Sequence, residues 1–166
     1  VISYIITKER ITSPVIEDAV KQAMNRLDGA YSLILMNEEK LIAARDKYGF
    51  RPLCYGRTNS GTYIVASESC ALNAVDAHFI RDLEPGEIVV FDRYGVHSIR
   101  EHCNKVKPTP CVFEYIYFAR PDSVIDGCPV HDARLRAGEF LAQEHPVAAD
   151  IVVGVPDSGI DGAIGY

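Results

Sequence analysis

The sequence lacks tryptophan, a long apolar run and any closely spaced pair of cysteines. No apolar stretch approaches the ~18 residues that a membrane-spanning helix requires, so we expect no membrane partner. The five cysteines contain no C-x-x-C pair, which argues against a disulfide framework and against a metal site built from local spacing. No two histidines share ligand spacing on one helix face, which argues against a histidine metal site as well.

Basic side chains are also scarce. Lys and Arg together number 17 against 23 for Asp and Glu, which gives a net charge of −6. This acidic balance argues against a nucleic-acid partner and a polybasic membrane surface, and it is ordinary for a cytoplasmic protein. With 48% hydrophobic residues over 166 positions, the chain is long enough to bury one core and part of a second.

The first hundred residues show a helix followed by short strands. Ser13 and Pro14 are typical of a helix start, and Gly29 of its end. Strands separated by Gly, Asn and Ser turns follow at residues 31–36, 41–45, 53–56, 62–66, 87–91 and 96–99, with a short helix at 70–75. A helix followed by consecutive hairpins predicts an α+β fold.

The last third of the chain has a different order of elements. They are a polar connector at 101–112, an aromatic-rich buried strand at 111–118, a helix at 130–144, an apolar strand at 150–155 and a helix that begins near Ser158. The helix at 130–144 is expected to face inward with Ala133, Ala137, Phe140 and Leu141. Strand, helix and strand in this order predict a parallel sheet.

Several segments match one known family in its own order. They are Gly29–Leu33, Ala44–Leu53, Ala66–Cys70, Glu84–Glu87, Cys111–Ser123 and Val153–Ser158. Together they resemble the glutamine phosphoribosylpyrophosphate (PRPP) amidotransferases, and the resemblance covers nearly the whole chain. The first four segments occur in many class II glutamine amidotransferases, whereas the last two point to this branch.

The resemblance also implies a division into domains. Residues 1–100 are similar to the second half of an N-terminal nucleophile (Ntn) hydrolase domain, an αββα sandwich with class II glutamine amidotransferase activity. Residues 101–112 connect this part to residues 113–166, which are similar to the start of an α/β phosphoribosyltransferase fold.

The family resemblance implies an activity in purine synthesis. Members of the family convert PRPP, glutamine and water into phosphoribosylamine, glutamate and pyrophosphate. The resemblance also implies a cytoplasmic homo-oligomer that uses Mg²⁺. The nucleophile of the family is the N-terminal cysteine of the mature enzyme, which this chain lacks. We therefore expect no catalytic residue here and no activity from the chain alone.

Pro156, Asp157 and Ser158 form the strongest local chemical signal. They follow an apolar segment and precede a helix, and such junctions bind phosphorylated ligands in α/β folds. The residues alone favour a simpler interpretation, in which Asp157 or Ser158 caps the helix. The resemblance implies that Ser158 belongs to the Mg²⁺ site that accompanies PRPP.

Two further residues acquire a role only through the resemblance. It implies that Tyr117 borders the channel that carries ammonia between the two active sites. In the iron–sulfur subclass of the family, Cys111 would be one ligand of a [4Fe-4S] cluster whose other ligands lie far downstream. A buried free thiol at Cys111 and a core aromatic at Tyr117 are the alternatives that the residues alone leave open.

Asp46 and Arg51 flank a Gly-containing turn. We interpret them as a structural ion pair that fixes this turn rather than as an active-site pair. Ser67, Glu68 and Ser69 follow a predicted strand, and one of the two serines is expected to cap the next helix.

Two other functions fit parts of the sequence. Another class II glutamine amidotransferase would share residues 29–91, but the Val155–Ser158 segment argues against it. A scaffold chain that never had a nucleophile is the non-enzymatic alternative.

Overall fold

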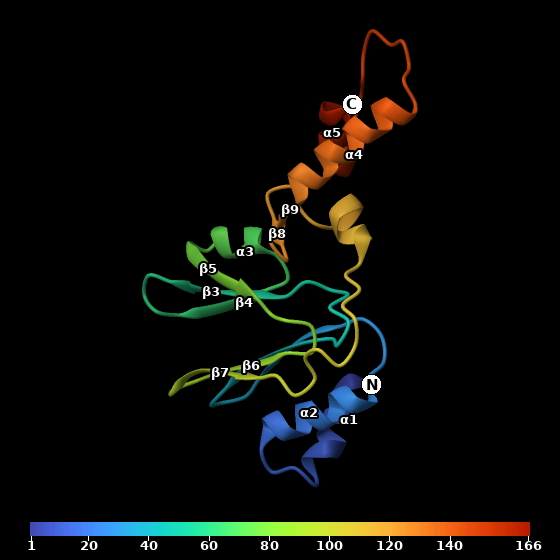
Figure 1. Cartoon of the computed structure of the whole chain (residues 1–166). Helices are drawn as coiled ribbons and strands as arrows, with labels where there is room; N and C mark the ends of the chain where they lie inside the picture. Colours follow the sequence, from blue (N-terminus) through green and yellow to red (C-terminus); the bar gives the residue numbers. More distant parts are fainter. The chain divides into compact units, whose positions relative to one another are not determined.

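The computed structural model describes all residues, 1–166, and the chain forms two compact units (Figure 1). The first unit contains residues 1–53 and 83–110, and the second contains residues 54–82 and 111–166. Each unit therefore takes two separate stretches of the chain. The domain boundaries predicted at residues 100 and 112 come from the family resemblance, whereas these two units are defined by contacts within the structure. The predicted boundaries therefore stay a prediction.

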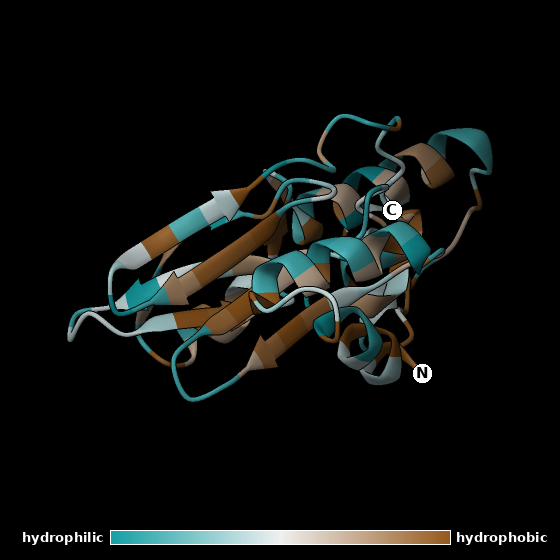
Figure 2. Ribbon diagram, turned by 90° about the horizontal axis from the view of Figure 1, so that it is seen from below, coloured by the Kyte–Doolittle hydropathy of each residue, from teal (hydrophilic) through white to brown (hydrophobic).

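A four-stranded antiparallel sheet forms the centre of the first unit. Its strands are β1 (Ser32–Met36), β2 (Leu41–Arg45), β6 (Ile88–Asp92) and β7 (Gly95–Ile99), in the order β1-β2-β6-β7. The two hairpins predicted in this part of the chain are confirmed, because β1 pairs with β2 and β6 with β7 as antiparallel neighbours joined by short turns. The apolar parts of the chain lie along the strands and the polar parts in the turns that join them (Figure 2).

Helices α1 (Ile2–Arg10) and α2 (Ile16–Arg26) pack on this sheet. Their core with the strands consists of Ile6, Val20, Ala23, Met24, Ile42, Ala44, Ile88 and Val90. The sequence predicted α2 but no helix at α1. The first residue of α2 follows Val15 rather than Ser13, and no side chain caps it, so the predicted serine cap was wrong.

The second unit begins with a smaller antiparallel sheet and a short helix. The sheet contains β3 (Cys54–Thr58), β4 (Tyr63–Ala66) and β5 (Ala77–Asp82) in the order β4-β3-β5, and α3 (Ser69–Asn73) lies between β4 and β5 in sequence. Cys54, Leu72 and Ala77 form its core. The strand β5 was not predicted, because its sequence places His78, Arg81 and Asp82 among only a few apolar residues.

The strand predicted at 111–118 is wrong. Residues Glu114–Phe118 form a π-helix, which closes with a hydrogen bond from the Ala119 N–H to the Glu114 carbonyl (3.0 Å). The physical reason lies in the partners of the backbone. Its carbonyls are satisfied by a buried arginine, Arg134, rather than by a neighbouring strand.

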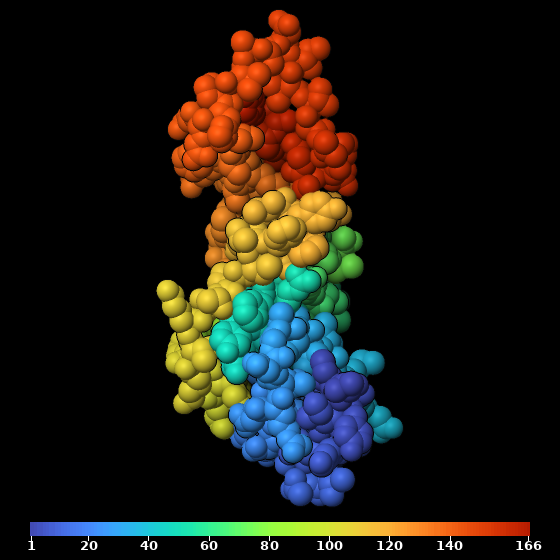
Figure 3. All heavy atoms as spheres, turned by 90° about the vertical axis from the view of Figure 1, so that its right-hand side faces the viewer, coloured from blue at the N-terminus to red at the C-terminus, as the bar shows by residue number.

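A small hairpin and two helices complete the second unit. They are β8 (Val124–Ile125), β9 (Cys128–Pro129), α4 (Val130–Glu144) and α5 (Ser158–Gly165), and the last two pack together as one body (Figure 3). The predicted bounds of α4 are confirmed, but its predicted inward face was wrong. Phe140 and Leu141 are 60% and 51% exposed, whereas Arg134 and Gly138 are buried.

The apolar strand predicted at 150–155 is not formed. Residues 151–155 belong to no helix or strand, and Ile151 and Val153 are 77% and 81% exposed. An extended segment becomes a strand only when a neighbour pairs with its backbone, and every paired strand in the structure is antiparallel. The α+β class is confirmed, whereas the parallel arrangement is not observed. None of the helices has the length and apolar character needed to cross a membrane.

Candidate functional site

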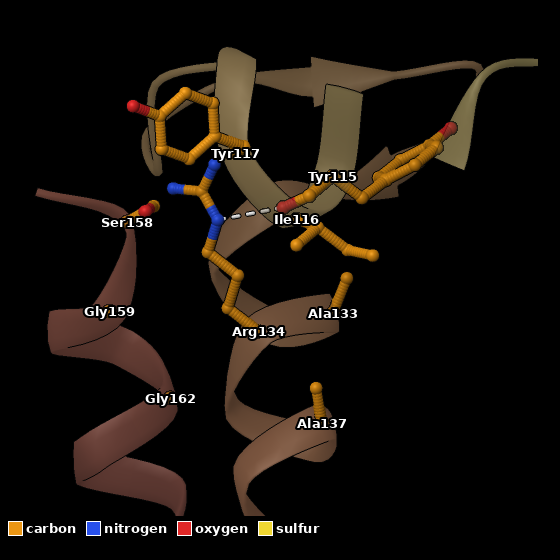
Figure 4. A pocket seen from close by; sticks show the side chains of 9 residues that line it. All are labelled: Tyr115, Ile116, Tyr117, Ala133, Arg134, Ala137, Ser158, Gly159 and Gly162. Carbon is orange, nitrogen blue, oxygen red and sulfur yellow. Dashed lines mark hydrogen bonds between the residues drawn. The ribbon is translucent and has the colours of Figure 1, made fainter. Parts of the chain in front are cut away.

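Two adjoining cavities in the second unit lie where the π-helix, α4 and α5 meet. One has a volume of about 290 Å³ and the other about 530 Å³. The smaller is lined by Tyr115, Ile116, Tyr117, Ala133, Arg134, Ala137, Ser158, Gly159 and Gly162 (Figure 4). The larger is lined by residues 117–121, Arg134, Asp157, Ser158, Ile160 and Asp161. Tyr117, Arg134 and Ser158 therefore border both.

Arg134 is the buried charge of this site. Its Nε donates to the carbonyl of Tyr115 and its Nη2 to the carbonyl of Ala119, each at 2.7 Å. These bonds hold the two ends of the π-helix against α4. Figure 4 shows the guanidinium between the side chains of Tyr117 and Ser158, so its positive charge lies at the cavity wall.

Asp161 of α5 supplies the opposite charge. It is 6% exposed, and its Oδ1 lies 3.0 Å from Nδ1 of His131. Its Oδ2 lies 3.8 Å from Nη1 of Arg134, and this oxygen has no hydrogen-bond partner. A buried carboxylate oxygen without a hydrogen bond is uncommon, and this one belongs to a residue that lines the larger cavity.

Ser158 is the first residue of α5 rather than its cap. The residue at the cap position is Asp157, and no side chain makes a capping hydrogen bond there. The predicted cap is therefore not observed, and the Ser158 hydroxyl lies at the wall of both cavities. The N–H groups of Gly159 and Ile160 already donate to the carbonyls of Val155 and Asp157, so the start of α5 offers an anion its positive dipole end rather than these two donors.

The oxygens of Ser158, Asp157 and Asp161 fit Mg²⁺ in kind. Mg²⁺ prefers oxygen ligands and is bound in proteins by one or two carboxylates together with substrate phosphates and water. No group of three or more His, Cys, Asp or Glu side chains is arranged to enclose a metal ion. The donor set therefore suits a metal that arrives with a phosphorylated ligand.

Tyr117 and Cys111 lie on either side of the start of the π-helix. Tyr117 is 62% exposed, and its ring contacts the edges of Phe113 and Phe118. Cys111 is half-buried and free, and it lines neither cavity. A cluster held by cysteines needs several thiolates, and the residues of this chain do not complete such a site around Cys111.

The turn after β2 in the first unit is built around Asp46. The side chain is fully buried, and its two oxygens accept the backbone N–H groups of Tyr48 (2.9 Å), Phe50 (3.2 Å), Tyr31 and Arg51 (both 3.4 Å). Burial, together with the charge of Asp46, raises the pKa of Tyr31 to about 12. Arg51 donates to Asp46 through its backbone N–H, and the ion pair predicted between the two side chains stays a prediction.

The second charge at this turn is Arg45, which the sequence analysis missed. It is buried, and it donates to the carbonyls of Arg51 (2.8 Å), Leu83 (2.6 Å) and Gly49 (3.1 Å). A charged residue at the end of the apolar strand Leu41–Arg45 is the signal that could have identified it.

Comparison with known proteins decides the family. Residues 7–74 match the model of a glutamine amidotransferase domain. An amidophosphoribosyltransferase of Methanocaldococcus jannaschii is 43% identical over 100% of this chain, and one of Mycobacterium tuberculosis is 50% identical over 91%. The solved structure of glutamine PRPP amidotransferase from B. subtilis, complexed with ADP and GMP, covers 99% of this chain at 43% identity with a TM-score of 0.91.

The chain belongs to the amidophosphoribosyltransferase family. It spans only part of its relatives, namely 38% of the M. jannaschii protein, 28% of the M. tuberculosis protein and 35% of the B. subtilis chain. The sequence-based recognition of the family is therefore confirmed over the length that the chain provides.

The motifs of amidophosphoribosyltransferases identified Ser158 and Tyr117 as site residues. They did not predict that Arg134, His131 and Asp161 would form a group beside them. The signal was present in α4, where the buried positions Val130, Arg134 and Gly138 recur every four residues. An arginine on a buried helix face requires acceptors and an opposite charge. The acceptors are the carbonyls of Tyr115 and Ala119, and the opposite charge is Asp161 of α5.

Proposed function

We propose that the protein is an amidophosphoribosyltransferase and that this chain supplies part of it. Glutamine and water would give glutamate and ammonia, and ammonia and PRPP would then give phosphoribosylamine and pyrophosphate. One observation carries the proposal: a relative with this name aligns with 100% of the chain, through both the amidotransferase match at 7–74 and the segment that contains Ser158.

The proposal assigns a role to each part of the chain. Residues 1–100 form part of the glutaminase domain, residues 101–112 are a connector, and residues 113–166 begin the phosphoribosyltransferase domain. The compact turn around Asp46 supports the glutaminase part, because a buried network of this kind gives a rigid scaffold for a substrate pocket.

In the second unit, the residues around the cavities suit both halves of the transfer. Tyr117, Ile116 and Ala137 give the smaller cavity a largely apolar wall, and such a wall suits ammonia because water would protonate it. The start of α5 and the Ser158 hydroxyl suit the pyrophosphate group of PRPP. Mg²⁺ that arrives with PRPP supplies charge neutralisation for the leaving pyrophosphate.

The full-length protein tests this function. Supplied with glutamine, PRPP and Mg²⁺, it should release glutamate and pyrophosphate in equal amounts. Glutamate release with no consumption of PRPP would contradict the proposal and favour another class of glutamine amidotransferase.

Replacing Ser158 with alanine in the full-length protein should raise the PRPP and Mg²⁺ concentrations needed for half-maximal rate. Loss of a capping residue would instead cost about 1 kcal/mol of stability without changing the need for substrate. Because Ser158 is not at the cap position, we expect the thermal midpoint to change little. Steady-state titrations and thermal unfolding of the same samples measure both quantities, and a lower midpoint with unaltered PRPP dependence would remove Ser158 from the site.

Cys111 carries the proposal of an iron–sulfur cluster. One thiolate of this chain would join ligands from elsewhere in the full-length protein. If so, Cys111→Ser should remove the visible absorbance of the cluster or make it sensitive to oxygen, whereas Cys54→Ser should not. Iron content and visible spectra of anaerobically purified protein check this, and an intact, stable cluster in the Cys111 variant would exclude Cys111 as a ligand.

A further inference from the structure

The Ser67–Ser69 segment between β4 and α3 does not cap its own helix. Glu68 occupies the cap position of α3, and no side chain makes a capping hydrogen bond there, so the predicted serine cap was wrong. The polar atoms of Glu68 and Ser69 are directed instead to a loop more than fifty residues further along the chain.

Glu68 and Ser69 hold this loop with side-chain hydrogen bonds. Oε2 of Glu68 accepts the backbone N–H of Arg120 and the hydroxyl of Ser123, both at 2.8 Å. Oγ of Ser69 accepts the backbone N–H of Val124, also at 2.8 Å. Ser69 and Ser123 are buried, so water competes little for these bonds, and the carboxylate strengthens two of them.

The other side of the same loop is held by α4. The carbonyl of Ala119 accepts from Arg134, the carbonyl of Pro121 accepts the N–H of His131 (3.1 Å), and the carbonyl of Ser123 accepts the N–H of Val130 (3.0 Å). We call residues 119–124, held between Glu68 and α4, the clamped loop. The π-helix with Tyr117 ends at Phe118, directly before it.

Glu68 lies inside the segment that matches the glutamine amidotransferase domain, and the clamped loop lies outside it. The carboxylate therefore joins a residue of the amidotransferase part to the loop that directly follows the π-helix and contains the Ala119 acceptor for Arg134. The connection is direct, because Glu68 itself accepts the hydrogen bonds from Arg120 and Ser123 of the loop.

We propose that Glu68 is a positioning residue that keeps ammonia release and ammonia use coupled by holding the clamped loop. This role rests on the proposed function. Glu68 lines neither cavity, and it acts through the loop and the π-helix. Its loss should leave each half-reaction intact and impair the transfer of ammonia from one to the other.

The test uses three variants of the full-length protein. Glu68→Ala removes the acceptor for Arg120 and Ser123, and Glu68→Gln restores an uncharged acceptor of the same shape. Glu139→Ala is the matched control, because Glu139 is an exposed glutamate of α4 in the same unit. Glutaminase activity, ammonia-dependent transfer and glutamine-dependent transfer are measured for each, together with hydrogen exchange of the 119–124 amides.

For Glu68→Ala we expect glutamine-dependent transfer to fall about tenfold, with glutamate in excess over phosphoribosylamine. Glutaminase and ammonia-dependent transfer should change by less than about twofold, and the amides of the clamped loop should exchange faster. Glu68→Gln should recover most of the coupling, and Glu139→Ala should match the wild type.

The other outcomes separate two failures. A wild-type protein without glutamine-dependent transfer would overturn the proposed function, and this role with it. Coupled activity in both wild type and Glu68→Ala, or an equal loss of all three activities in that variant, would overturn only the role of Glu68. If Glu68→Ala does not fold, Ser123→Ala removes one of the two bonds that Glu68 makes to the loop, and normal coupling together with normal exchange of the loop amides in that variant would also overturn it.

Discussion

Replacing Asp46 with alanine is expected to lower the free energy of unfolding by about 4 kcal/mol. The side chain is fully buried, and its oxygens accept backbone N–H groups from Tyr48 and Phe50 as well as from Tyr31 and Arg51. Alanine would leave these donors buried without an acceptor. Urea unfolding followed by circular dichroism measures the loss.

A matched control comes from the same unit. Asp28 is an exposed aspartate whose Oδ1 lies 3.6 Å from Nζ of Lys47, and its replacement by alanine should cost less than about 1 kcal/mol. Asp46→Asn keeps one acceptor oxygen and should fall between the two. Equal stability of the Asp46→Ala and Asp28→Ala proteins would show that the turn does not depend on Asp46.

Gly138→Ala should destabilise the packing of α4 on α5 by about 3 kcal/mol. A Cβ at this position would lie 2.0 Å from the carbonyl oxygen of Gly162, so the two helices would have to move apart. The added methyl group cannot be accommodated by a side-chain rotation, because the atom it meets belongs to the backbone. Thermal unfolding of the second unit, followed by hydrogen exchange of α4 and α5 amides, measures the effect.

Gly162→Ala is the control for this prediction. A Cβ there would meet no atom within 4 Å, and alanine favours a helix over glycine by about 0.8 kcal/mol. We therefore expect this variant to be as stable as the wild type or slightly more stable. Similar destabilisation by both substitutions would show that the close contact at Gly138 is not what makes alanine unfavourable there.

The elements that the sequence predicted well are those whose signals are local. The hairpin of β6 and β7 follows from the apolar run Ile88–Phe91 and the turn residues Asp92–Gly95 that come directly after it. The bounds of α4 follow from a proline before it and from helix-forming residues within it. Asp157 and Ser158 were found because they stand between an apolar segment and a helix.

The parts that the sequence did not predict depend on partners far along the chain. The aromatic segment around Tyr117 has the composition of a strand, yet Arg134 of α4 holds it as a π-helix. The hydrogen bond between Glu68 and Arg120 joins residues 52 positions apart, and no sequence pattern predicts a contact over that distance. Local propensity describes a segment by itself, whereas these contacts depend on the hydrogen-bond partners that Arg134 and Glu68 meet in the folded chain.

If the proposed function holds, the full-length protein moves the amide nitrogen of glutamine to PRPP without releasing it to solvent. The direct measurement supplies glutamine labelled with ¹⁵N at the amide, PRPP, Mg²⁺ and an excess of unlabelled ammonium, and determines the isotope in trapped phosphoribosylamine by mass spectrometry. The account predicts that the product carries mainly ¹⁵N. Product labelled in proportion to the bulk ammonium pool, or no product at all, would contradict it.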